Sequence, residues 1–217
     1  MIVSNLDHNN KTQRADWLER FRTLTTFILL NMLWLFGALL IVTIPAVTAA
    51  LFAGIAPWTQ GREAYKPAAT FWVNIRHFWR KATVLTLIDL GGGLLVLLNG
   101  LILRQMDQGQ LLTLAAMSVT ILVAIVLLLL NVYAWPLLVT VDPPLGLWLK
   151  NAAKLALSHP FWGGAIVLMA AIPMILSLFL PGFFRLTFIF AITALIIQWG
   201  GWRIIRRYVT EDEILQS

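Results

Sequence analysis

The sequence contains no cysteine, which excludes disulfide bonds, thiol chemistry and metal sites with cysteine ligands. It is also poor in charge: 12% of its 217 residues are charged, whereas a soluble domain of this length carries about 25%. What remains between the uncharged runs is too small for a separate soluble domain, so we expect one membrane domain that comprises residues 1–217. The long uncharged runs are residues 23–61, 90–103, 108–141, 155–184 and 186–202.

Sequence patterns of catalytic sites are absent as well. The three histidines, His8, His77 and His159, lie far apart in the sequence. There is no His-Glu-x-x-His motif, no glycine-rich phosphate loop and no close pair of intramembrane acids. We therefore expect no enzyme activity, no catalytic or metal-binding residues and no cofactor. The net charge of +6 does not indicate nucleic acid, because the basic residues flank apolar segments, where they orient a protein in the bilayer.

The longest uncharged run, residues 23–61, has 39 residues and Pro45 near its middle. A bilayer core of about 30 Å needs about 20 apolar residues in a helix, so this run is long enough for two crossings. A proline breaks the interior of a helix but is well tolerated in its first turn. The sequence therefore predicts a helical hairpin with helices at residues 24–43 and 45–58. The first helix exceeds a signal-peptide core in length, so we expect it to be retained.

Four further helices complete the expected bundle, at residues 82–103, 111–136, 160–180 and 184–202. The positions of Lys and Arg support this number. With six crossings, 14 of the 16 Lys and Arg residues lie on one side, and only Arg104 and Arg185 on the other. If residues 23–61 crossed once, the division would be 10 to 6. The positive-inside rule thus favours an all-α six-transmembrane-helix bundle with both termini in the cytoplasm.

Each predicted hairpin follows a stretch that mixes aromatic residues with cations, at residues 17–22, 71–81 and 145–157. The middle stretch is the clearest, because Phe71, Ile75 and Phe78 repeat at helical spacing. We expect short amphipathic interfacial helices on the cytoplasmic side, with rings at headgroup level and cations toward anionic lipid. A docking surface for a cytoplasmic partner is the alternative. The candidate lipid or partner face comprises Phe71, Trp72, Arg76, Phe78, Trp79, Arg80 and Lys81.

Asp89 is the one acidic residue well inside a predicted membrane helix, and an intramembrane acid is a functional candidate by default. The apolar residues of its helix outweigh an insertion cost of roughly 2.5 to 3.5 kcal/mol, so Asp89 needs no cationic partner. Either it is a neutral carboxyl that hydrogen-bonds between helices, or it takes part in proton coupling or ligand binding. The candidate intramembrane polar site consists of Asp89, Asn31 and Asn131. Both asparagines, like Asn99 and Gln198, are expected to hydrogen-bond between helices.

Small residues indicate two places where helices pack closely. One is the glycine run at residues 91–93, directly after Asp89, for which a broken helix beside an acid, as in some transporters, is the alternative. The other is the series Ala46, Ala50 and Gly54, which recurs every four residues. We therefore expect the second helix to be enclosed by protein more than by lipid.

Residues along nearly the whole chain resemble the YesL-like family of bacterial membrane proteins. The family pattern opens an apolar helix with Asn and a Leu-Trp-Leu core, followed by Val-Thr-Ile and Thr-Ala-Ala-Leu. A Phe-rich basic segment that ends near Lys-Ala-Thr comes next. The corresponding positions here are Asn31, Leu33 to Leu35, Val42 to Ile44, Thr48 to Phe52 and Phe71 to Thr83. Trp135 to Leu138 and Asn151 to Lys154 are also similar.

The resemblance implies a multi-pass protein of the bacterial cell (inner) membrane, and it names no reaction. Members of the family are often encoded beside carbohydrate ABC importers and polysaccharide-degrading enzymes, which implies an accessory role in carbohydrate uptake. We therefore expect a non-enzymatic accessory component whose partners are the lipid bilayer and a carbohydrate ABC importer. It would act by contact through its cytoplasmic aromatic and basic face. The alternative is a small-solute transporter that uses Asp89.

Overall fold

Helices make up all the regular structure in the described part of the chain. The computed structural model describes residues 21–62, 67–106 and 110–209. Six of its helices are long and apolar enough to cross a membrane, which confirms the predicted all-α membrane fold. The described elements are a first helix Phe21–Ala38, the 3₁₀ turn η1 (Ile41–Thr43), α2 (Ile44–Thr59), α3 (Pro67–Leu103), α4 (Leu111–Thr140), α5 (Leu145–Ser158), α6 (Pro160–Ser177) and α7 (Gly182–Ile205).

The predicted hairpin is present, but its first helix ends five residues earlier than expected. It stops at Ala38, not at residue 43, and η1 joins it to α2. The Thr43 hydroxyl donates hydrogen bonds to the carbonyls of Gly37 and Leu40. These bonds stabilise a tight turn, because they occupy carbonyls that a continuing helix would use. Pro45 falls in the first turn of α2, as predicted.

The second helix of this hairpin is enclosed by protein, as its small residues predict. Ten of the 16 residues of α2 are buried. Ala46, Ala50 and Gly54 all belong to this buried set, and a Cβ atom on Gly54 would lie 2.8 Å from a Leu30 methyl carbon. The helix ends where Gly61 adopts a φ of 70°, a left-handed conformation that glycine takes without steric cost.

The interfacial helix predicted at residues 71–81 is not a separate element. It continues without a break into the predicted membrane helix at residues 82–103, and together they form α3, a single helix of 37 residues. At 1.5 Å per residue it is about 55 Å long. No proline interrupts it, and the three glycines at residues 91–93 stay helical. Gly92 packs against Leu127 of α4, which agrees with close packing and not with a broken helix.

Of the other two predicted amphipathic stretches, residues 145–157 form a short helix of their own, α5, with Trp148 and Ala152 buried. The stretch at residues 17–22 lies mostly outside the described residues. Helix α4 extends four residues beyond its predicted end, through Pro136 to Thr140. Helix α6 ends at Ser177, three residues early, because the next three amides bond to carbonyls three residues back. Helix α7 runs to Ile205.

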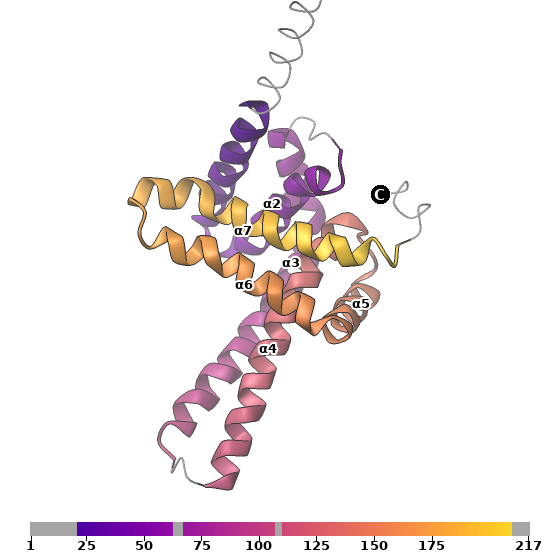
Figure 1. Ribbon diagram of the computed structural model, residues 1–217. Helices are drawn as coiled ribbons and strands as arrows, with labels where there is room; N and C mark the ends of the chain where they lie inside the picture. Colours follow the sequence, from indigo (N-terminus) through magenta and orange to yellow (C-terminus); the bar gives the residue numbers. More distant parts are fainter. Residues whose placement is uncertain (1–20, 63–66, 107–109, 210–217) are drawn as a thin grey trace, which may run out of the picture.

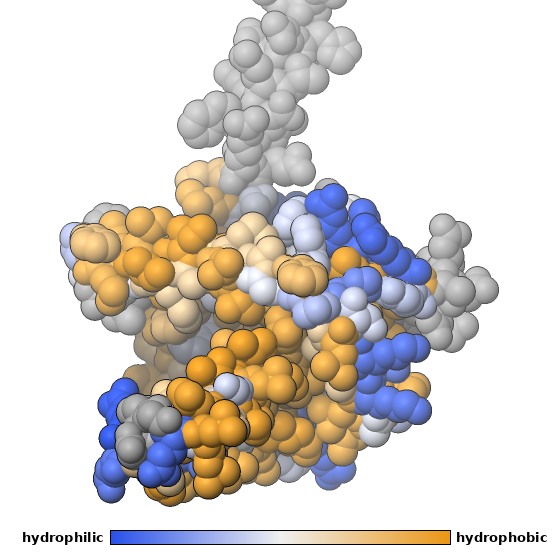
Figure 2. Space-filling model, turned by 60° about the horizontal axis from the view of Figure 1, so that its bottom comes forward, coloured by the Kyte–Doolittle hydropathy of each residue, from blue (hydrophilic) through white to orange (hydrophobic). Residues whose placement is uncertain are grey.

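Two hairpins point in different directions from the body of the molecule (Figure 1). Helices α6 and α7 lie side by side, whereas α3 and α4 form an arm that extends beyond all other helices. Helix α4 is largely exposed in the arm, but all residues from Val132 to Leu138 are buried. The surface is a broad apolar expanse with hydrophilic residues gathered at separate ends (Figure 2). This division of polarity is what a bilayer requires of a spanning protein.

Candidate functional site

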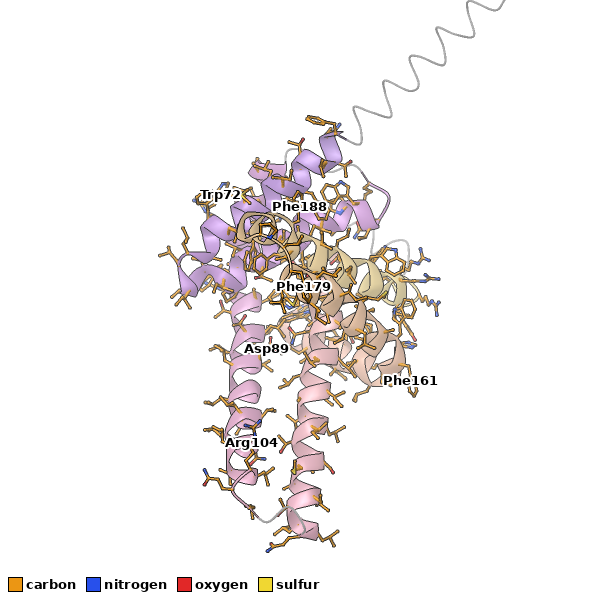
Figure 3. All side chains as sticks on the ribbon, turned by 60° about the vertical axis from the view of Figure 1, so that its left-hand side comes forward. Trp72, Asp89, Arg104, Phe161, Phe179 and Phe188 are labelled. Carbon is orange, nitrogen blue, oxygen red and sulfur yellow. The ribbon has the colours of Figure 1, made fainter. Side chains whose placement is uncertain are left out.

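Asp89, the acidic residue within a membrane helix, lies at the root of the arm, where α3 and α4 leave the body of the molecule (Figure 3). Its carboxylate oxygen Oδ1 accepts a hydrogen bond from Nδ2 of Asn131 on α4, at 2.7 Å. The same Nδ2 donates to the Leu127 carbonyl at 3.0 Å, and Oδ1 of Asn131 accepts from the Trp135 indole at 2.9 Å. Asp89, Asn131 and Trp135 therefore form one hydrogen-bonded cluster, which we call the arm-root cluster.

The arm-root cluster joins two helices through neutral donors. Asn131 uses both polar atoms of its amide, one toward α3 and one within α4. Asp89 is only partly buried, so its carboxyl lies at the edge of the packed helices. Farther along the arm, Asn99 donates to the Thr120 hydroxyl at 3.0 Å and makes a second polar link between α3 and α4. Interhelical hydrogen bonds of this kind hold membrane helices in register.

The third residue of the predicted polar site, Asn31, lies elsewhere. Its side chain is fully buried, and its Oδ1 accepts a hydrogen bond from the backbone amide of Ala191 on α7 at 3.0 Å. One turn away, the Trp34 indole donates to the Thr48 hydroxyl at 3.1 Å and stacks on Phe190 with a ring-centroid distance of 4.0 Å. Asn31 and Trp34 thus bind the first helix to α2 and α7 and do not converge on Asp89.

Gln198 on α7 is a further buried amide. Its side chain is fully buried, yet neither amide atom has a hydrogen-bond partner within the described part of the chain. The sequence predicts an interhelical hydrogen bond for this residue, and the described residues provide none. The cost of leaving a buried polar atom unsatisfied is about 1 to 3 kcal/mol.

The predicted aromatic and basic face of α3 is divided between the core and the surface. Phe71 and Phe78 are 1% and 5% exposed, so these two rings pack inside the protein and are not available to lipid or to a partner. Their spacing does give a helical stripe, but that stripe faces the core. Trp72 and Trp79, by contrast, are 60% and 50% exposed, and Figure 3 shows Trp72 at the outer surface.

The exposed part of this face combines two tryptophans with two arginines. Arg76 and Arg80 are exposed on the same stretch of α3, and the Arg80 guanidinium lies 5.5 Å from the centre of the Trp79 ring. We call Trp72, Arg76, Trp79 and Arg80 the outer α3 surface. It presents flat rings and planar cations without a nearby acid from its own helix, a composition that is enriched at protein interfaces.

Lys81, the last residue of the predicted face, points to a different contact. Its ammonium donates to the carboxylate of Asp142 and to the Pro143 carbonyl, the latter at 2.8 Å. Nε2 of His77, one turn earlier, lies 2.6 Å from Oδ2 of Asp142. Asp142 has a φ of 46°, so the two α3 side chains hold a strained turn between α4 and α5. The sequence alone does not predict that His77 and Lys81 bind Asp142, although an isolated acidic residue directly before two prolines indicates a turn there.

Two further groups of aromatic and polar contacts involve α6, α7 and the residues that flank these helices. The Arg203 guanidinium lies 5.4 Å from the Trp162 ring centre and 5.6 Å from that of Trp199. Nε2 of His159 lies 2.9 Å from the Tyr208 hydroxyl. His159 and His77 have separate partners, and the described residues contain no group of three His, Cys, Asp or Glu side chains that could hold a metal ion.

Comparison with known proteins identifies a family model that matches part of the chain. The family model described as "Protein of unknown function, DUF624" matches residues 27–100. This range begins in the first helix and ends near the end of α3, so it includes Asn31, Trp34 and Asp89. YesL-like proteins belong to this family, which confirms the predicted resemblance over the matched range. No curated protein and no solved structure matches the chain.

Proposed function

The DUF624 family model, of unknown function, matches residues 27–100, and from the resemblance to YesL-like proteins we propose a non-enzymatic accessory component of carbohydrate ABC uptake. In this proposal the protein lies in the bacterial inner membrane with both termini in the cytoplasm. It acts by contact with the importer and not by chemistry of its own. The resemblance to YesL-like proteins supports the link to carbohydrate import, and the positive-inside rule supports the orientation.

The outer α3 surface is the observation that carries the proposal. Trp and Arg are the side chains that most often dominate binding energy at protein interfaces. The adjacent stripe of the same helix, with Phe71 and Phe78, is already buried. The exposed tryptophans and arginines therefore contribute no comparable core packing, which supports a role toward something outside the chain.

The arm-root cluster supports the alternative, a small-solute transporter, less well. The Asp89 carboxylate already accepts a hydrogen bond from Asn131, and α3 runs unbroken past it. A transporter site of this kind usually uses a discontinuous helix. Solute flux into liposomes that contain only this protein, and its loss in Asp89→Asn, would favour the transporter over the accessory component.

Co-purification from native membranes tests the proposal. The Arg76→Ala/Arg80→Ala variant removes two cations from the outer α3 surface, and Arg206→Ala/Arg207→Ala removes two exposed cations from the end of α7. A loss of about 2 kcal/mol, typical of interface hot spots, corresponds to more than a tenfold loss of affinity. We therefore expect the first variant to retain less than a tenth of the importer subunits that the unmodified protein retains.

The second variant should retain them in full, because Arg206 and Arg207 lie outside the outer α3 surface. It has the same net charge as the first variant, which makes it the matched control. Equal losses in both variants would show that charge alone attracts the importer. No loss in either variant would show that the outer α3 surface does not bind the importer. Replacement of Trp72 and Trp79 by Ala provides a second, uncharged test of the same surface.

A further inference from the structure

A cavity of about 380 Å³ lies between the ends of α4 and α7 and the length of α5. It is separate from the outer α3 surface and from the arm-root cluster. Its volume lies within the roughly 300 to 1,000 Å³ of known ligand sites. The residues that matter for its chemistry are Leu137, Val141, Asn151, Lys154, Ile205 and Tyr208.

The lining of this cavity has two chemically different parts. Seven of its eleven residues are apolar, and the other four are Asn151, Lys154, Ser158 and Tyr208. Lys154 is the one charged residue among them, and no lining residue is acidic. Three of the polar residues stand on α5 at spacings of three and four, so they share one side of that helix. A site with one cation, several hydrogen-bonding groups and apolar walls suits an anionic amphiphile.

The position of the cavity also matches the depth of a lipid headgroup. Helix α4 ends at Thr140 and α7 at Ile205, so the cavity opens where two membrane-spanning helices end. The amphipathic α5 lines it along its length, and the lining residue Leu147 is 50% exposed, while Leu157, outside the lining, is 69% exposed. The Tyr208 hydroxyl is positioned by His159, whose Nε2 lies 2.9 Å away. A phospholipid has a polar headgroup above apolar chains, and this cavity has a polar rim above apolar helix ends.

We propose that this cavity binds one anionic phospholipid. The phosphate pairs with the Lys154 ammonium and accepts hydrogen bonds from neighbouring polar side chains such as Asn151 and Ser158. The upper part of an acyl chain lies along Leu137, Val141 and Ile205 and leaves toward the bilayer. A bound lipid would fill the space between α5 and α7 and hold these two elements together.

Native mass spectrometry of the full-length protein tests the proposal. The protein is reconstituted in nanodiscs of equal parts phosphatidylcholine and phosphatidylglycerol and released under gentle conditions. We expect one retained phosphatidylglycerol for each chain and about tenfold less in Lys154→Ala, since charge-assisted hydrogen bonds to phosphate are strong. Lys150→Ala is the matched control: this residue is one turn away on α5 and exposed, and it does not line the cavity.

A second variant tests the cavity without a change of charge. Ser158 lines the cavity from an exposed position on the last turn of α5, so Ser158→Phe fills the space and should reduce lipid retention as Lys154→Ala does. Equal loss in Lys150→Ala, or equal retention of both lipids, would overturn the proposal. So would displacement of the lipid by millimolar glycerol phosphate, which would identify a soluble phosphate site.

One segment of the chain could compete for the same cavity. The acidic residues Glu211, Asp212 and Glu213 follow shortly after Val209, which lines it. Lipid retention that appears only after these three residues are changed to Gln, Asn and Gln would assign the cavity to the tail and overturn the lipid proposal. Retention that is the same with and without these changes would support it.

Discussion

At the scale of single residues, the polar side chains in the membrane act mainly as links between helices. Asn131 connects α3 to α4 through Asp89, and Asn31 connects the first helix to α7 through the amide of Ala191. Both links follow from one rule: a polar group that is removed from water must find a hydrogen-bond partner within the protein. The sequence identifies these residues as polar and intramembrane, but their partners are 42 and 160 residues away.

The arm-root cluster gives a prediction for Asn131→Leu. This change removes the donor to Asp89 and the acceptor of the Trp135 indole, and each such bond in a membrane protein contributes about 0.6 kcal/mol. We therefore expect the free energy of unfolding in mixed micelles to fall by about 1 kcal/mol. Asn99→Leu removes one link in the exposed arm and should cost about half as much. A larger cost for Asn99→Leu would contradict the assigned role of the cluster.

At the scale of helices, the faces that pack together differ from those that amphipathic spacing indicates. On α3, Phe71 and Phe78 face the core, while Trp72 and Trp79, one position along, face outward. Both pairs have the same spacing of seven residues, so periodicity predicts the helix but does not decide which stripe is buried. The choice follows from the rotation of α3 against α2, which the local sequence does not encode.

Glycines show the same dependence on neighbouring helices. On α7, a Cβ atom at Gly201 would lie 2.8 Å from the Val132 carbonyl oxygen and 2.6 Å from Pro136 Cγ, both on α4. Neither atom can move independently of the backbone or its ring. At Gly91 and Gly93 on α3, the same Cβ would meet nothing within 4 Å. Only the first of these positions needs glycine for packing.

This contrast predicts opposite effects of the same substitution. Gly201→Ala forces α4 and α7 apart, and overpacking of this kind costs about 1 to 3 kcal/mol. Gly91→Ala and Gly93→Ala add helix propensity of up to about 1 kcal/mol each without a clash. We expect the apparent melting temperature in detergent to fall for the first variant and to hold or rise for the other two. A fall of similar size in all three would show that the glycine run has a packing role of its own.

At the scale of the whole molecule, most of the exposed cations stand on the helices of the body, and one stands on the arm. Arg76 and Arg80 on α3, Lys150 and Lys154 on α5, and Arg203, Arg206 and Arg207 at the end of α7 are all exposed. Arg104 lies far from them, on the arm (Figure 3). The apolar surface between the two groups is continuous in the view of Figure 2. This separation is the three-dimensional counterpart of the charge asymmetry along the sequence.

The orientation follows as a prediction that the absence of cysteine makes simple to test. Val42, at the turn of the first hairpin, is 89% exposed, and Gly146, at the start of α5, is exposed with open space around it. A membrane-impermeant thiol reagent applied to intact cells should label Val42→Cys and not Gly146→Cys. Both should react after the cells are opened. Labelling of Gly146→Cys alone in intact cells would show that the orientation is the reverse of the predicted one.

The sequence by itself determined the helical class, the number of membrane helices and the hairpin at Pro45. These depend on local properties, namely the length of apolar runs relative to the bilayer and the backbone chemistry of proline. Only the tertiary structure decided that the Phe71 stripe is buried, that Asp89 pairs with Asn131 while Asn31 joins α7, and that Lys81 holds the turn at Asp142. These contacts depend on how rigid helices are rotated and placed against one another. Many rotations satisfy the same apolar pattern, so close packing selects among them.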